Sequence, residues 1–278
     1  IGLVGAVIWL LRQKEPVVKL SLFSLPSFSM PSLMIFFVGF ALYSSSTLLP
    51  MMVQSNFGYD ATLAGMVLSP SGLVVICIMP IIGKLVNKVQ AKYLISTGMF
   101  LMAFGMWATA QITPQSDYWT LVQVRILQVI GLPFLFVPSS TLAFSKIKAV
   151  DSSNASAIVA LMRNLGGSIG IAIVTNKLIQ SQQVEQNNIV QHLTNFDIGY
   201  NNALYNMTNT IKNLGFSENQ ASQMALGKIY RELMHQASLL AYADAYEFVA
   251  TIMILLGIVA LFMPKNELHG KKKTVVIE

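Results

Sequence analysis

Six long apolar stretches constrain the fold of this chain more than any other feature. Each has about the 20 residues that a helix needs to cross the hydrocarbon core of a bilayer. Only 11% of the 278 residues are charged, whereas a soluble domain usually carries about 25% charged residues. The sequence therefore predicts an all-α membrane protein with six full transmembrane helices. We place the spans near residues 32–54, 62–83, 93–112, 119–142, 155–178 and 238–264.

Three further segments do not read as full spans. Residues 1–11 are apolar but long enough for only half a crossing, so we expect a partial span and a chain that is the later part of a longer polypeptide. Residues 179–237 are rich in Gln and Asn and are too polar to cross. We expect this long connection to form helical structure outside the membrane, with Ser217 and Gln220 in capping-box spacing. Residues 265–278 form a polar tail.

The positions of Lys and Arg predict the orientation, because cytoplasmic loops are enriched in positive charge. Twelve Lys and Arg lie in the loops and tail on one side of the predicted spans, and four lie on the other side. This places the C-terminus in the cytoplasm and residues 179–237 outside the cell membrane. The predicted location is the inner (plasma) membrane, crossed several times.

The fifth span carries a charge well inside it, at Arg163. Such a residue is expected to face protein or water and not lipid. Gly167 and Gly170 follow at the i+4 and i+7 positions, on the arginine's own helix face. We interpret this face as the wall of a polar cavity, with open space in front of the arginine. The alternative is an arginine that only holds two helices together.

The fourth span also carries an arginine, Arg125, with Gln128 three residues later. Residues at this spacing are neighbours on a helix surface, so the two side chains are expected to share a polar face. Arg125 is also close enough to the outer end of its span to extend its charge to the membrane surface. Both interpretations fit the sequence.

The last span has two acids near its outer end, Asp244 and Glu247. Glu247 is predicted at nearly the same depth as Arg163. Intramembrane charges of opposite sign tend to pair or to face water. One hypothesis is therefore that Glu247 pairs with Arg163, with proton relay as a further step. The other is that both acids mark the wet outer end of a tilted helix.

Several functions have no support in the sequence. Cys77 is the only cysteine, and the three histidines are scattered outside the spans. We therefore expect no catalytic residues, no metal site and no cofactor. The basic residues lie in short loops without the dense patch of a nucleic-acid-binding protein, so no nucleic-acid partner is expected. A membrane-embedded enzyme is disfavoured for the same lack of a catalytic cluster.

Four segments resemble a known family. They are GYDATLAGMVLSPSGLVVICIMPIIGKLV at 58–86, LFVPSSTLA at 135–143, LMRNLGGSIGIAI at 161–173 and HQASLLAYADAYEF at 235–248. These are similar to the second half of the fourteen-span EmrB/QacA-type multidrug–proton antiporters of the major facilitator superfamily. The resemblance covers nearly the whole chain.

The resemblance implies the C-terminal half of a major facilitator fold, with the N-terminal half missing. It implies proton-coupled efflux of amphipathic drug-like compounds across a lipid bilayer by alternating access. It also implies a possible periplasmic adaptor and outer-membrane channel as partners. The rival hypothesis is a membrane assembly or structural subunit that does not transport.

One family motif departs from its usual form. Such transporters carry a Gly-x-x-x-Asp-Arg/Lys-x-Gly loop whose aspartate forms a charged bridge between helices. Here Gly83 and Lys88 fit the pattern, but Asn87 replaces the aspartate and Gln90 the later glycine. The resemblance implies a conformational loop at this position, and the asparagine puts its charged bridge in doubt.

Overall fold

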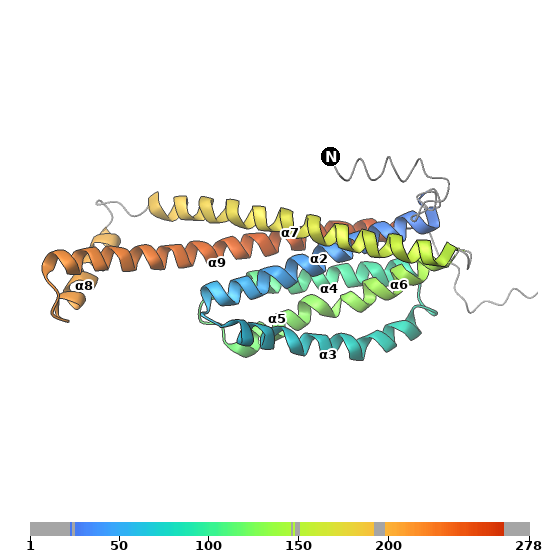
Figure 1. The fold of residues 1–278 in the computed structure, drawn as a ribbon, viewed down its shortest axis with the longest axis horizontal. Coiled ribbons are helices and arrows are strands. Elements are labelled where there is room, and N and C mark those ends of the chain that lie inside the picture. Colours follow the sequence, from blue (N-terminus) through green and yellow to red (C-terminus); the bar gives the residue numbers. More distant parts are fainter. Residues whose placement is uncertain (1–22, 24–25, 146, 148–150, 192–197, 264–278) are drawn as a thin grey trace, which may run out of the picture.

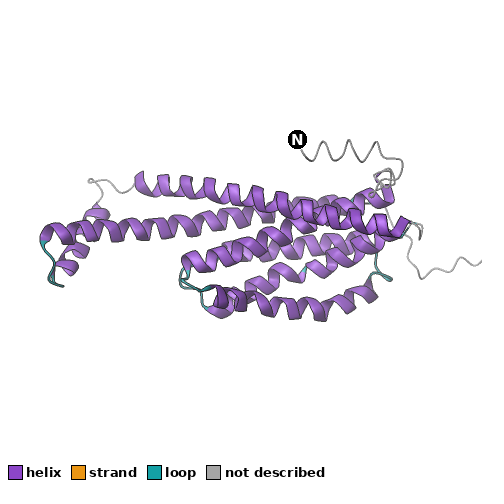
Figure 2. Cartoon of the chain, viewed as in Figure 1, coloured by secondary structure: helices purple, strands orange, loops and turns teal. Residues whose placement is uncertain are grey.

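The described part of the chain is a bundle of long helices. The computed structural model describes residues 23, 26–145, 147, 151–191 and 198–263 (Figure 1). This part is helical and contains no strand (Figure 2). Its α-helices are α2 (Pro26–Asn56), α3 (Ala61–Leu85), α4 (Ala91–Ala110), α5 (Tyr118–Ile130), α6 (Leu132–Phe144), α7 (Ser152–Gln191), α8 (Ile198–Lys212) and α9 (Glu218–Leu261).

The predicted fold class is confirmed, with six candidate spans among the described residues. The candidate spans are α2, α3, α4, the α5–α6 pair, α7 and α9, and each contains a long apolar window. The expected partial span at 1–11 and the tail at 265–278 lie outside the described residues.

The fourth span is divided into two helices. The sequence predicts one helix over 119–142, but α5 ends at Ile130 and α6 begins at Leu132, with Gly131 between them. Pro133 explains the break, because a proline has no N–H to donate and its ring collides with the preceding turn. Gly131 also lies against α4, where a Cβ added to it would be 2.4 Å from the Gly98 carbonyl oxygen.

The polar connection is not a separate unit from the spans that flank it. α7 runs through residue 178 to Gln191, and α9 begins at Glu218, well before the predicted start of the last span. Both helices therefore extend beyond the rest of the bundle, with α8 at their far end (Figure 1). The polar residues near 179–191 include no glycine or proline. Composition therefore changes there without ending the helix.

Side-chain caps fix several helix starts. Asp60 accepts a hydrogen bond from the Leu63 amide at 2.8 Å, and Ser217 and Gln220 form the predicted capping box at the start of α9. Asp117 caps α5. Hydrogen bonds from the Thr120 hydroxyl and then its amide lower the pKa of the Asp117 carboxyl. The stabilisation that this cap contributes is therefore fully present above the pKa of the carboxyl in the unfolded chain. It is lost as pH falls through the lowered pKa of the folded protein.

The helices pack mainly as adjacent pairs. α2 packs against α7, while α4 packs against α9 and against the α5–α6 span. Large side chains such as Met99, Met102 and Met106 of α4 are fully buried between these helices. α3 is the most peripheral span, and Leu73, Ile76 and many of its other apolar side chains are exposed.

The extended parts of α7 and α9 should remain side by side in the membrane-bound protein. Gln186 of α7 donates a hydrogen bond to the Tyr230 hydroxyl of α9 at 3.4 Å. With exposed Cys77 replaced by serine, the pair Gln186→Cys and Tyr230→Cys is expected to be joined within one chain by a short bis-maleimide. The measurement is a mobility shift on denaturing gels. Each single-cysteine variant is the control, and failure of the pair to react intramolecularly would contradict this packing.

Candidate functional site: a buried arginine network

A buried arginine connects two spans that are far apart in the sequence. Arg125 of α5 is only 5% exposed. Its guanidinium donates to the Ser45 hydroxyl at 3.1 Å, to the Ser46 hydroxyl at 2.9 Å and to Gln128 Oε1 at 3.0 Å. The two serines lie on α2, so the arginine joins that helix to α5. The predicted contact between Arg125 and Gln128 is confirmed, and the arginine is buried within the bundle instead of reaching its surface.

The same network continues into two further helices. Gln128 is fully buried and donates through Nε2 to the Thr109 hydroxyl of α4 at 2.7 Å, and Thr109 donates to the Gly105 carbonyl at 2.7 Å. The buried Tyr246 hydroxyl of α9 lies close to Gln128 and Arg125 but has no hydrogen bond of normal geometry. Four spans therefore meet around one polar cluster.

The cluster has an unusual charge balance. Its acceptors are hydroxyl and amide oxygens, and Arg125 forms no ion pair with any residue that the structure describes. Its Nε–H is buried without an acceptor. A buried charge is costly unless it is paired and fully hydrogen-bonded. An intramembrane charge held by neutral groups alone is therefore a candidate functional group.

The glycines near Arg163 do not leave open space. A Cβ added at Gly167 would lie 2.4 Å from the Tyr43 ring, and one at Gly170 would lie 2.8 Å from the Phe40 carbonyl oxygen. Both residues are buried against α2. The predicted cavity in front of this face is therefore wrong, because α2 fills it. Gly170 instead lets the two backbones approach closely, as small residues do between membrane helices, and Gly167 leaves room for the Tyr43 ring.

Arg163 itself is half-buried. Its guanidinium lies 5.9 Å from the centre of the Phe136 ring of α6, within the range of a cation–π interaction. Its Nε–H is buried and has no hydrogen-bond acceptor. The side chain thus connects α7 to α6, which agrees with the alternative interpretation of an arginine that holds helices together.

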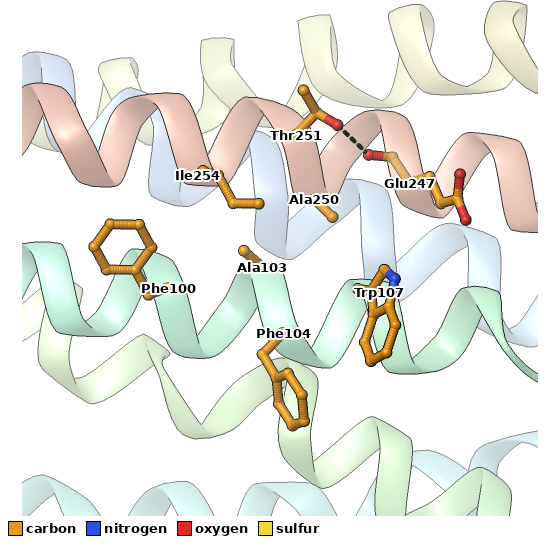
Figure 3. Close-up of a pocket in the computed structure, with 8 residues that line it drawn as sticks. All are labelled: Phe100, Ala103, Phe104, Trp107, Glu247, Ala250, Thr251 and Ile254. Carbon is orange, nitrogen blue, oxygen red and sulfur yellow. Dashed lines mark hydrogen bonds between the residues drawn. The ribbon is translucent and has the colours of Figure 1, made fainter.

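Glu247 does not pair with Arg163. The two residues form no ion pair, and the Glu247 side chain is exposed on α9. It lies at one end of a groove of about 460 Å³ between α4 and α9 (Figure 3). The hypothesis of an Arg163–Glu247 pair is therefore wrong: similar depth did not place the two charges on facing sides. Asp244, one turn earlier, is half-buried.

The loop after α3 forms a hydrogen bond to the end of its own helix. Gly83 lies within α3, and the exposed Asn87 donates through Nδ2 to the Gly83 carbonyl at 3.5 Å. Lys88 is also exposed. The asparagine thus bonds to the end of its own helix. The conformational role predicted for Gly83, Asn87 and Lys88 stays a prediction.

Four members of the network were not predicted from the sequence. Ser45, Ser46, Thr109 and Tyr246 are ordinary residues of otherwise apolar spans, and their types alone do not distinguish them from other polar residues there. Ser45, Thr109 and Tyr246 are buried, and Ser46 is half-buried. The run Ser44–Thr47 in the first full span was the one available signal, since it places adjacent hydroxyls within an apolar helix.

Comparison with known proteins agrees with this architecture. Residues 1–171 match the model of the Major Facilitator Superfamily. The chain is 27% identical over 267 residues to the colistin resistance protein EmrB of Acinetobacter baumannii, covering 95% of this chain and 52% of the relative.

Two further relatives give a similar picture. The fatty acid resistance protein FarB of Neisseria gonorrhoeae is 24% identical over 265 residues, covering 95% of this chain and 50% of FarB. The multidrug export protein EmrB of Escherichia coli K12 is 25% identical over 260 residues, covering 93% of this chain and 49% of that protein. The chain thus spans about half the length of these curated relatives. With six candidate spans and a family match over more than half of its residues, the chain belongs to the Major Facilitator Superfamily.

Proposed function

We propose that this chain is the C-terminal part of a proton-coupled multidrug efflux transporter that works by alternating access. Its substrates are amphipathic drug-like compounds, and protons move in the opposite direction. The match to the Major Facilitator Superfamily supports a transporter in preference to an enzyme. The names of the relatives, which refer to colistin, fatty acids and multiple drugs, support efflux.

The observation that carries the proposal is the buried Arg125 network. Charged groups inside spans are rare and typically lie along substrate or ion pathways. Arg125, Gln128 and their partners join α2, α4 and α5 in one cluster. A cation held by neutral groups can attract a carboxylate or an anionic substrate group when the helices rearrange. In this proposal, Arg125 and Gln128 take part in coupling proton movement to export. Gly167 and Gly170 have a structural role in the α2–α7 contact. Arg163 likewise has a structural role, since it holds α7 to α6.

The missing N-terminal half supplies the second bundle of the transporter. Alternating access requires two bundles that move against each other. Support comes from α3, whose apolar face is exposed although the helix is a candidate span. Part of that face would be covered by the other bundle and part by lipid.

We also propose the orientation that the basic loops predict. The C-terminus is cytoplasmic, and the far ends of α7 and α9 with α8 stand outside the inner membrane. In a host with two membranes, this projection is suited to contact a periplasmic adaptor and through it an outer-membrane channel. Its exposed apolar side chains, such as Tyr205, Leu214 and Phe216, are consistent with such a contact.

The test uses the complete reading frame that contains this chain, expressed in cells loaded with ethidium. We expect export above the empty-vector rate, and loss of that export when the proton gradient is collapsed. Arg125→Lys should lower the initial rate about tenfold, equivalent to about 1.4 kcal/mol. Lysine keeps the charge but not the planar set of donors that reaches both serines and Gln128.

A matched control is Arg231→Lys, the same substitution on the exposed part of α9. It should export at the parental rate. Export that persists without a proton gradient would refute proton coupling. No export above the vector rate at normal protein levels would favour the rival hypothesis of a non-transporting subunit.

A further inference from the structure

Two polar groups of the buried arginine network have no hydrogen-bond partner. The Tyr246 hydroxyl and the Arg125 Nε–H are both buried, and neither bonds to any residue that the structure describes. Tyr246 is 0% exposed and lies beside Arg125 and Gln128. A buried polar group without a partner costs stability, and each such group in a native protein calls for an explanation. Here the two groups belong to one cluster, so a single rearrangement can satisfy both.

The chemistry of the two groups is complementary. A guanidinium only donates hydrogen bonds, whereas a phenolic hydroxyl both donates and accepts. Tyr246 is therefore an acceptor for Arg125 that the present arrangement leaves unused. It comes from α9, while the two serine hydroxyls that now accept from Arg125 come from α2. The arginine thus has acceptors on two other helices and uses those of one.

The rest of the network tolerates an exchange of acceptors. The Ser45 hydroxyl donates to the Leu42 carbonyl within α2 at 3.1 Å, so its own hydrogen stays bonded when the guanidinium leaves. Gln128 keeps its hydrogen bond to Thr109 of α4 at 2.7 Å. Most polar groups of the cluster are therefore satisfied with Arg125 on either helix. Two discrete arrangements of this kind are what a conformational switch between packed helices requires.

We propose that Tyr246 is a positioning residue that accepts the Arg125 guanidinium in a second conformation of the bundle. In the present conformation, Arg125 ties α2 to α5. In the second, it bonds to the Tyr246 hydroxyl, releases Ser45 and Ser46, and ties α9 to α5 instead. α2 is then free to move relative to α5. The role of this exchange in transport rests on the proposed efflux function, whereas the exchange itself is measurable without transport.

The first measurement compares Tyr246→Phe with the parent in the complete reading frame. Phenylalanine keeps the ring and removes only the hydroxyl. We expect the initial rate of ethidium export at saturating dye to fall about tenfold, equivalent to about 1.4 kcal/mol, with the half-saturating dye concentration unchanged. The unfolding temperature of the purified variant should stay the same or rise, because the hydroxyl has no partner in the present conformation.

A matched control is Tyr242→Phe, the same substitution one turn earlier on α9. Tyr242 is also buried, at 3% exposed, and its hydroxyl lies near Ser55 of α2. It has no part in the proposed exchange. This variant should export ethidium at the parental rate.

The second measurement does not depend on export. With the native cysteines replaced by serine, spin labels are attached at Gln54→Cys on α2 and at Gln123→Cys on α5, two exposed positions. Electron paramagnetic resonance then gives the distribution of distances between the labels. We expect two distances in the parent and in Tyr242→Phe. Tyr246→Phe should keep only the shorter distance, because without the hydroxyl Arg125 stays on α2.

Three results would overturn the proposal. The first is ethidium export by Tyr246→Phe at the rate of an active parent. The second is a lower unfolding temperature for Tyr246→Phe, which would show that the hydroxyl is already bonded. The third is a single label distance in the parent, or two distances in Tyr246→Phe. A parent that exports no ethidium would refute the proposed function, and the label distances would still decide whether Arg125 exchanges its partners.

Discussion

Gly166→Ala is expected to destabilise this protein by about 3 kcal/mol or more, although it adds a single methyl group. A Cβ at Gly166 would lie 1.9 Å from the Phe36 carbonyl oxygen. The obstacle is backbone, so a rotamer change cannot relieve the collision and α2 must move away from α7. That movement would also disturb the reciprocal contact, in which a Cβ at Gly39 would lie 2.1 Å from the Arg163 carbonyl oxygen.

The matched control is Gly65→Ala on α3, where a Cβ would have nothing within 4 Å. Alanine favours a helix by up to about 1 kcal/mol over glycine, so this variant should be neutral or slightly more stable. The measurements are the amount of protein in the membrane and its thermal aggregation in mild detergent. Equal behaviour of the two variants would show that α2 and α7 do not cross as closely as described.

Gln128→Leu is expected to cost about 2 to 3 kcal/mol, the usual effect of removing a neutral hydrogen-bond partner from a buried charged group. Gln128 accepts from Arg125 and donates to Thr109, so leucine leaves the guanidinium with two hydroxyls and no amide oxygen. The double variant Arg125→Met with Gln128→Leu removes the charge as well. Replacing both polar partners by apolar groups is often nearly neutral, so the double variant should recover most of the stability.

The double variant should distinguish the effect of the network on stability from its effect on transport. The double variant is expected to resist denaturation better than Gln128→Leu, yet to export no ethidium above the vector rate. The two measurements are unfolding of the purified variants and ethidium export by the complete reading frame, which tests the proposed efflux function. A double variant less stable than the single one would show that Arg125 stabilises the bundle. A double variant that exports normally would remove the network from the transport machinery.

The positions of the spans could be predicted from the sequence because bilayer thickness sets a minimum apolar length. The same pattern could not show where α7 and α9 end. Hydropathy reports the depth at which lipid gives way to water, whereas a helix ends only where the backbone is interrupted. Residues 179–191 change composition without such an interruption. Pro133, in contrast, was a visible signal for the break at Gly131.

The candidate site was predictable only within single helices. Arg125 and Gln128 belong to one helix, so their contact follows from the three-residue spacing. Ser45 and Ser46 come from α2, and which side of α2 faces α5 depends on packing around the whole bundle. The same limit explains the failed Arg163–Glu247 pair. The depth of a residue in the membrane can be counted along its span. The rotation of the span about its own axis, which decides the helix that the residue faces, cannot be obtained in this way.

The unbroken course of α7 and α9 has a mechanical consequence. The two helices have 40 and 44 residues, or about 60 and 66 Å at 1.5 Å per residue. Each is therefore a continuous helix with one part inside the bundle and one part beyond it (Figure 1). A tilt of about 10° would displace the end of an arm of about 30 Å by roughly 5 Å. A change in the tilt of these spans would thus appear as a translation at α8.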